Sequence, residues 1–138
     1  MVHALHTMHA LLKPRGILID IHPGASKPEI QVRARDGAAF AGSLEESDDF
    51  VEYGQAQAAL DQVVSEGVYA LEHQGQFAFA LHAGSLDSLQ SFLAENWKDA
   101  ILTRGVIRKI GALLAGPPAG REIVVTEQVR IARLRRRE

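Results

Sequence analysis

The sequence contains no cysteine, which excludes disulfide bonds, thiolate zinc sites and cysteine nucleophiles. Only 6% of its residues are aromatic, and no apolar run approaches the roughly 18 residues that a membrane-spanning helix needs. Between Arg35 and Lys98 there is no basic residue, whereas acidic residues are frequent there and both flanking segments are basic. The chain therefore segregates its charges although its net charge is only −2. We expect much of this pattern to be matched within the folded protein.

What is present is the composition of an ordinary soluble globular protein, with 46% hydrophobic and 23% charged residues among 138. A chain of this length buries enough surface to form a core, and its composition is not typical of disordered or fibrous proteins. The N-terminus shows no secretory pattern, because His3, His6 and His9 interrupt its apolar residues. We expect a single domain over residues 1–138, located in the cytoplasm.

The opening 24 residues form a helix-turn-strand pattern. Apolar residues recur at spacings of three and four, which predicts a helix over Val2–Lys13. Pro14-Arg15-Gly16 ends this helix, since proline cannot continue it and glycine suits the turn. The β-branched run Ile17–Ile21 then predicts a short buried strand, which Pro23-Gly24 closes.

Alternating apolar residues around turn signals predict two β-hairpins in the middle of the chain. The first pairs residues 30–35 with residues 38–44 around Asp36-Gly37, and the second pairs 68–73 with 76–82 around Gln74-Gly75. In the second hairpin a two-residue loop places Ala70 opposite Phe79. Both faces of that hairpin are mostly apolar, so we expect each to be covered.

Three further helices and a long final strand complete the predicted fold, and capping residues or breakers mark the helix ends. The helices run from Ser47 or Asp48 to about Glu66 before Gly67, from Ser85 to Trp97, and from Thr103 to the break at Gly116-Pro117-Pro118. The strand spans 122–134, with Ile123, Val125, Val129 and Ile131 on one face, and a basic tail covers 134–138. These elements predict an α+β fold with about four helices and a mixed, largely antiparallel sheet.

Residues 5–24, LHTMHALLKPRGILIDIHPG, resemble the class I S-adenosylmethionine-dependent methyltransferases. In that family a helix, a turn of the form Leu-x-Pro-Gly-Gly and an inner parallel strand follow one another. Here the turn reads Leu12-Lys13-Pro14-Arg15-Gly16, with Arg15 in place of the family's first glycine. The predicted strand Glu122–Leu134 is similar to the long antiparallel strand that ends such domains.

The resemblance implies a cofactor site that this sequence does not complete. The family binds S-adenosylmethionine on a glycine-rich loop upstream of the matched unit, and no G-x-G sequence occurs in these 138 residues. The cofactor is therefore expected only if a second chain supplies the glycine-rich half. In the parent fold the strand matching Ile17–Ile21 has partners on both sides, so its apolar edge has to be covered or paired here. We expect a homodimer, or assembly with a separate cofactor-binding chain.

Asp20 and His22 are the candidate catalytic residues. They lie two residues apart on one side of the predicted strand, at its carboxyl end, where α/β sheets present groups to ligands. Such a pair predicts general acid–base chemistry; the structural alternative is that Asp20 bonds a neighbouring backbone group and His22 begins the loop. A pocket between the sheet and the helices would add Tyr69 and Trp97 as ligand-binding residues.

Two other patterns carry weaker hypotheses. His3, His6 and His9 are spaced by three residues, which drifts by about 60° per step on a helix, so they do not converge on one metal ion and no metal site is predicted. The C-terminal arginines from Arg130 to Arg137 are compatible with nucleic-acid binding, but the chain is slightly acidic and carries no recognition motif. Pairing with the acidic middle of the same chain or of a second subunit is the favoured interpretation.

Three functions thus remain open. The preferred one is a methyltransferase-like domain that is non-catalytic alone and acts as a self-associating or partner-binding module. The alternative is a small-molecule-binding domain or enzyme with a pocket between sheet and helices. Association with nucleic acid is the weakest of the three, and no membrane segment is predicted.

Overall fold

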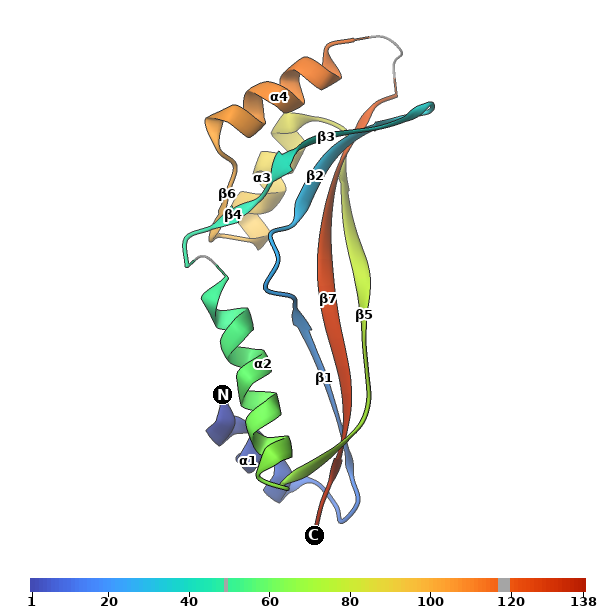
Figure 1. Ribbon diagram of the computed structural model, residues 1–138. Coiled ribbons are helices and arrows are strands. Elements are labelled where there is room, and N and C mark those ends of the chain that lie inside the picture. The colour runs from blue at the N-terminus through green and yellow to red at the C-terminus, as the bar shows by residue number, and fades with distance from the viewer. Residues whose placement is uncertain (49, 117–119) are drawn as a thin grey trace. The chain divides into compact units, whose positions relative to one another are not determined.

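The computed structural model describes residues 1–48, 50–116 and 120–138, and the fold over them is α+β, as predicted (Figure 1). The helices are α1 (Val2–Leu11), α2 (Val51–Ser65), α3 (Leu86–Asn96) and α4 (Arg104–Leu114). The strands are β1 (Ile17–Pro23), β2 (Glu29–Ala34), β3 (Gly37–Ser43), β4 (Glu45–Glu46), β5 (Tyr69–Ala83), β6 (Ala100–Ile101) and β7 (Glu122–Arg136). The pairs β1–β7, β2–β3, β2–β7 and β4–β6 are all antiparallel. None of the helices in these residues is long and apolar enough to cross a membrane.

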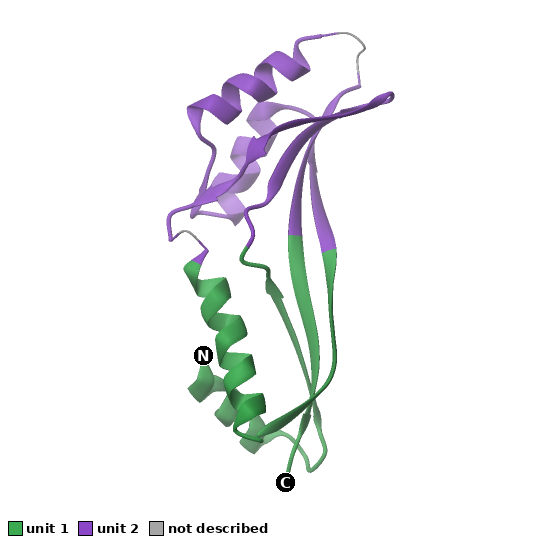
Figure 2. Cartoon of the chain, viewed as in Figure 1, with its two compact units in different colours: residues 1–25, 51–77, 128–138 green, residues 26–50, 78–127 purple. Residues whose placement is uncertain are grey.

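The chain forms two compact units, each assembled from separate stretches of sequence (Figure 2). Unit 1 comprises Met1–Ala25, Val51–Phe77 and Gln128–Glu138. Unit 2 comprises Ser26–Phe50 and Ala78–Glu127. The long strands β5 and β7 contribute residues to both units, so each unit closes its core with segments that are distant in sequence.

Unit 1 is a small sheet with α1 and α2 packed against one face (Figure 1). β1 pairs with the C-terminal part of β7 in a continuous antiparallel register, from Ile17 opposite Arg135 to Pro23 opposite Val129. β5 pairs with β7 as well. The buried core residues of this unit include Leu5, Ala59, Leu60, Val63, Tyr69 and Leu134.

Unit 2 has its own core beneath α3 and α4. β2 pairs with β3 and with the N-terminal part of β7, and the inward side chains of these strands meet the two helices. Gly42 is required where β3 approaches α4, because a Cβ at this position would lie 2.5 Å from Cγ2 of Val106 and its φ is +146°. The fully buried core residues of the unit include Ile30, Leu44, Leu89, Ile110 and Ile123.

The predicted helix ends agree with the structure at Ser85, Thr103 and Gly67, whereas α2 begins at Val51, later than the predicted start at Ser47 or Asp48, and α1 ends at Leu11 instead of Lys13. The Ser85 side chain accepts a hydrogen bond from the Ser88 backbone N–H and forms a capping box, and Thr103 caps α4 through the backbone N–H of Val106. Gly67 follows α2 with φ +75°, a conformation that glycine adopts without strain. α4 ends at Leu114, and the predicted break at Pro117-Pro118 lies outside the described residues.

The second predicted hairpin is wrong, because residues 69–83 form one continuous strand, β5. Gln74-Gly75 lies inside the strand, so Ala70 and Phe79 do not face each other across a turn. β7 is itself 15 residues long and supplies a partner for an equally long strand. Pairing with a distant strand therefore overrides a local turn signal. The predicted coverage is also wrong, since residues 73–80 are exposed.

The first strand is present as predicted but is buried on one face only. Ile17, Ile19 and Ile21 are 40%, 51% and 57% exposed. Leu18 packs against the core of unit 1, so the alternation of side chains divides β1 into a covered and an open face. A largely apolar run such as Ile17–Ile21 indicates a buried strand, but here the helices cover only one face of it.

Two smaller differences from the predictions concern the position of the turn between β2 and β3 and the burial of the apolar residues of β7. Ala34 pairs with Gly37, so the first hairpin turns at Arg35-Asp36, one residue earlier than predicted. On β7, Ile123 is buried in unit 2, whereas Ile131 is 36% exposed on unit 1. The apolar residues of the final strand therefore do not form one buried row.

Candidate functional site

The structure brings the two candidate catalytic residues into direct contact. Nδ1 of His22 lies 2.5 Å from Oδ2 of Asp20, and both side chains are mostly buried. The alternation along β1 places Leu18, Asp20 and His22 on the face that the helices cover. The contact follows from their spacing of two residues, as the sequence predicts.

This contact determines which nitrogen of the imidazole is available. A carboxylate oxygen accepts hydrogen bonds, so in the neutral imidazole the Nδ1–H of His22 donates to Oδ2 of Asp20. The neutral ring then presents Nε2 as an acceptor. Nε2 is buried and has no hydrogen-bond partner among the described residues. A buried acceptor without a partner is costly, which makes this nitrogen the clearest candidate for contact with a ligand.

His22 lines a cleft of about 380 Å³ within unit 1. The cleft lies between α2 and the strands β1, β5 and β7, all of which contribute lining residues. Its apolar residues are Leu60, Val64, Leu71, Ile131, Ala132 and Leu134. A concave site of this kind, with an apolar lining and a few polar groups, is typical of small-molecule sites.

The polar lining of the cleft forms a connected network on one side. Nη1 of Arg130 donates to Oε1 of Gln57 at 2.8 Å, and Nε2 of Gln57 donates to Oδ1 of Asp61 at 2.8 Å. Arg130 stands directly opposite His22 in the register of β1 and β7. A guanidinium and an unpaired imidazole nitrogen therefore come from adjacent backbone positions of the cleft.

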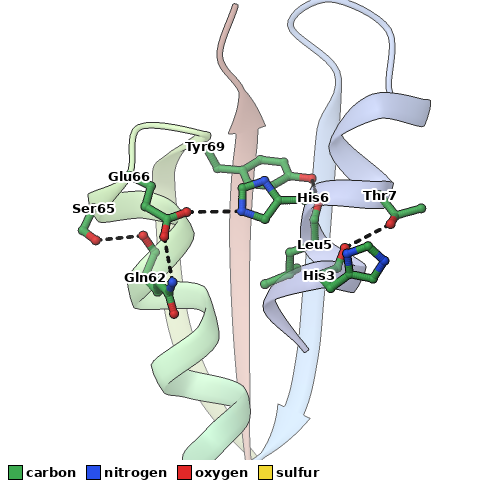
Figure 3. Close-up of polar contacts among 8 residues, drawn as sticks. All are labelled: His3, Leu5, His6, Thr7, Gln62, Ser65, Glu66 and Tyr69. Atoms are coloured by element: carbon green, nitrogen blue, oxygen red, sulfur yellow. Dashed lines mark hydrogen bonds and ion pairs between the residues drawn. The ribbon is translucent and has the colours of Figure 1, made fainter.

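Tyr69, a predicted ligand-binding residue, lies in the core of unit 1 and is not among the residues that line the cleft. Its hydroxyl donates to the backbone carbonyl of Leu5 in α1 at 3.0 Å (Figure 3). Burial raises the pKa of Tyr69, and the positive charge of Arg136 opposes this effect. Tyr69 thus attaches α1 to the sheet.

Trp97, the other predicted ligand-binding residue, belongs to unit 2. Its indole Nε1 donates to Oε1 of Glu46 at 2.6 Å. Trp97 lines a smaller cleft of about 140 Å³, together with Phe79, Phe92 and Glu127. Burial raises the pKa of Glu127, and the charge of Glu46 raises it further.

The three N-terminal histidines do not converge on one site. His6 points toward Glu66 of α2 (Figure 3), and its Nε2 lies 3.2 Å from Oε2 of that residue. His9 contacts the backbone carbonyl of Arg137 and lies edge-on to the ring of Tyr69. No group of three or more histidine, aspartate or glutamate side chains in the described part of the chain could hold a metal ion.

The open face of unit 1 carries a second arrangement of interest. Ile17, Ile19 and Ile21 form an exposed row on β1, and their partners on β7 are Arg135, Arg133 and Ile131. Glu72 of β5 pairs with both arginines: its carboxylate lies 2.9 Å from Nε of Arg133 and also accepts hydrogen bonds from Arg135. The C-terminal arginines therefore match an acidic residue of the middle segment within one chain.

S-adenosylmethionine does not fit the residues described. The resemblance implies a glycine-rich turn that leads from a strand into a helix, where the backbone can approach the ligand. The turn from β5 into α3 contains the single glycine Gly84, and the side chain of Ser85 occupies the cap of that helix. Glycines with positive φ lie at Gly37, Gly42, Gly67 and Gly120, and none of these leads from a strand into a helix.

Comparison of the chain with known protein families, curated proteins and solved structures finds no match.

Sequence reasoning did not identify Gln57, Asp61, Gln76 or Arg130 as site residues. A signal was available on α2, because Gln57, Leu60, Asp61 and Val64 recur at the spacing of one helix face. The contribution of Gln76 and Arg130 depends on how β5 and β7 pair, which the sequence does not reveal.

Proposed function

We propose that this chain is a methyltransferase-like assembly module, non-catalytic by itself, whose strand β1 pairs with β1 of a second copy. The observation that carries the proposal is the state of β1. Among the described residues it is hydrogen-bonded to β7 on one side only, and it exposes three isoleucines. An exposed apolar edge strand is a template for pairing with another chain.

The antiparallel pairing of β1 with the final strand supports the methyltransferase-like character. The resemblance of residues 5–24 implies that such a domain ends in a long antiparallel strand, and β7 spans Glu122–Arg136 and runs antiparallel to β1. It also implies that the strand corresponding to β1 has neighbours on both sides. A second chain would supply the neighbour on the other edge.

The sequence of β1 is self-complementary in an antiparallel arrangement. With the two-fold axis at Ile19, this residue lies opposite its own copy, and Ile17 lies opposite the second copy's Ile21. The apolar row then continues across both copies on one face. On the other face Asp20 lies opposite the second copy's Leu18, so the two carboxylates are not directly opposed. A two-fold pair therefore brings together matching side chains.

The charges next to this row do not oppose pairing. Glu72 compensates much of the positive charge of Arg133 and Arg135 on the same face. Like charges across an interface are destabilising, and here they are partly neutralised before association. We place this assembly in the cytoplasm, where a protein without cysteine loses nothing from the reducing environment.

Sedimentation equilibrium of the full chain tests the proposal. At micromolar concentration the wild type should have the mass of a dimer. Ile19→Lys should yield a monomer, because it places a charge at the two-fold axis where it faces its own copy. Leu11→Lys is the matched control: Leu11 is 81% exposed on α1 of the same unit, and its substitution should leave the mass unchanged.

If the wild type is a monomer at micromolar concentration, β1 does not pair with a second copy of this chain. A different chain would then have to cover the edge of β1. An Ile19→Lys variant that remains dimeric, with circular dichroism like that of the wild type, would place the interface elsewhere. Calorimetry with S-adenosylmethionine tests the proposal that the chain is non-catalytic by itself. Micromolar binding of the cofactor to the isolated chain would contradict that proposal.

A further inference from the structure

From the cleft of unit 1 we infer a binding site for a small apolar α-hydroxy acid, with the ligand hydroxyl on Nε2 of His22 and its carboxylate on Arg130. This site does not rest on the proposed assembly, because the residues that line the cleft come from one chain.

The apolar residues that line the cleft indicate that part of the ligand is apolar. Leu60 and Val64 of α2 and Leu71 of β5 line one cleft with Ala132 and Leu134 of β7. The volume of about 380 Å³ is near the lower end of the range for ligand sites, which is about 300–1,000 Å³. A single aromatic ring or a branched aliphatic group suits a cleft of this size.

The hydroxyl follows from His22. In the neutral imidazole the Nδ1–H donates to Asp20, so Nε2 is an acceptor, and it has no donor among the described residues. An O–H group of a ligand is such a donor. A ligand without it leaves the buried nitrogen unpaired, which makes the site selective for the hydroxyl.

The carboxylate and its position follow from Arg130. A guanidinium offers donors in a planar fork that matches a carboxylate. Arg130 and His22 are direct neighbours across two antiparallel strands, where Cα atoms are about 4.5–5.5 Å apart. The two groups that they bind should therefore be close together in the ligand, as the hydroxyl and carboxylate of an α-hydroxy acid are.

Asp61 limits the charge of the ligand. Its carboxylate also lines the cleft and is connected to Arg130 through Gln57. It disfavours a second negative charge, so the site should select a monocarboxylate over a dicarboxylate.

In the first experiment the wild-type chain is titrated with phenyllactate, and binding is measured from the shifts of backbone amide signals in two-dimensional NMR spectra. Phenylpropionate, which lacks the hydroxyl, and phenyllactamide, which lacks the negative charge, are the comparison ligands. Phenyllactate should bind about tenfold more tightly than either analogue, and the shifted amides should belong to residues of the cleft.

Variants then assign each contact. His22→Phe keeps a flat ring without an acceptor and should abolish the preference for phenyllactate over phenylpropionate. Arg130→Gln should abolish the preference over phenyllactamide. Asp20→Asn tests a positioning role, since an amide that donates to Nδ1 moves the imidazole proton to Nε2 and should remove only the hydroxyl preference.

Asp61→Asn provides a variant that should gain affinity, by a few-fold, because it removes the repulsive charge from the cleft. Asp87→Asn is its control, as Asp87 is an exposed carboxylate on α3 of unit 2. Equal binding of the three ligands by the wild type, or no amide shifts at millimolar phenyllactate, would overturn the inference. The wild-type titration decides this even if a variant fails to fold.

Discussion

The carboxylate of Glu72 accepts two hydrogen bonds from the guanidinium of Arg135, one from Nε and one from Nη2, the latter at 3.2 Å. Arg135 also donates to the backbone carbonyl of Arg15, so one side chain joins β5, β7 and the turn before β1. Arg133 approaches the same carboxylate at 2.9 Å. The two chain segments with opposite charge thus meet inside unit 1.

This pair predicts a specific pH dependence. The hydrogen bond from Arg135 lowers the pKa of Glu72, so the native state binds fewer protons there than the unfolded state. The stabilisation is present above the ordinary glutamate pKa of about 4.3 and is lost as the pH falls through the lower native value. Glu72→Gln should remove this part of the acid-induced decline in the free energy of unfolding.

Urea denaturation at stepped pH values on both sides of the ordinary pKa measures the effect. Glu52→Gln is the control, because Glu52 is an exposed carboxylate in the first turn of α2. Identical acid sensitivity in the wild type and the Glu72→Gln variant would contradict the prediction.

Glu127 should behave in the opposite way. Burial, and then the charge of Glu46, raises its pKa, so the native state binds this proton more tightly than the unfolded state does. Its contribution to stability is fully present below the ordinary glutamate pKa and is lost as the pH rises through the raised native value. Glu127→Gln should therefore stabilise the protein at neutral pH, whereas Glu95→Gln, on the exposed side of α3, should have little effect. Chemical denaturation at neutral and at acidic pH checks the sign, and a less stable Glu127→Gln variant at neutral pH would refute it.

Removal of the Tyr69 hydroxyl should loosen α1. Tyr69→Phe leaves the carbonyl of Leu5 without its donor and should cost about 1 kcal/mol in the free energy of unfolding. Because burial raises the pKa of Tyr69, its native-state ionisation lies above the ordinary tyrosine value, and stability is lost as the pH rises through it. Ultraviolet titration of the two tyrosines in the sequence should show a late component that disappears in Tyr69→Phe. Titration of both tyrosines together near the ordinary value would rule out the buried donor.

A pair of glycine substitutions tests the continuity of β5. At Gly75 an added Cβ meets only Cγ2 of Ile131, at 3.9 Å, so Gly75→Ala should be tolerated and should stabilise by about 0.4–1 kcal/mol through the unfolded chain. Gly67 has φ +75°, and Gly67→Ala should destabilise by about 1 kcal/mol or more. Thermal unfolding compares the two variants. A hairpin turning at Gln74-Gly75 with a positive φ at glycine would instead make Gly75→Ala the destabilising change.

The Asp20–His22 contact illustrates how far local reasoning reaches into the site. Residues two apart on a strand share a face, so their proximity is legible in the sequence. The residues that accompany them are not, because Arg130 follows His22 by more than a hundred positions and reaches it only through the register of β1 and β7. Whether Asp20 and His22 act together on a ligand stays a prediction that the titrations above address.

What the sequence by itself determined are the features whose causes are local. Helix ends at Ser85, Thr103 and Gly67 follow from single capping or left-handed residues, and the β2–β3 hairpin follows from a short alternating pattern around a turn. Tertiary structure alone decided that β5 continues through Gly75 and that β1 is covered on one face, since both depend on where β7 and the helices lie. Strand pairing joins residues distant in sequence, and its hydrogen bonds and burial outweigh a two-residue turn preference.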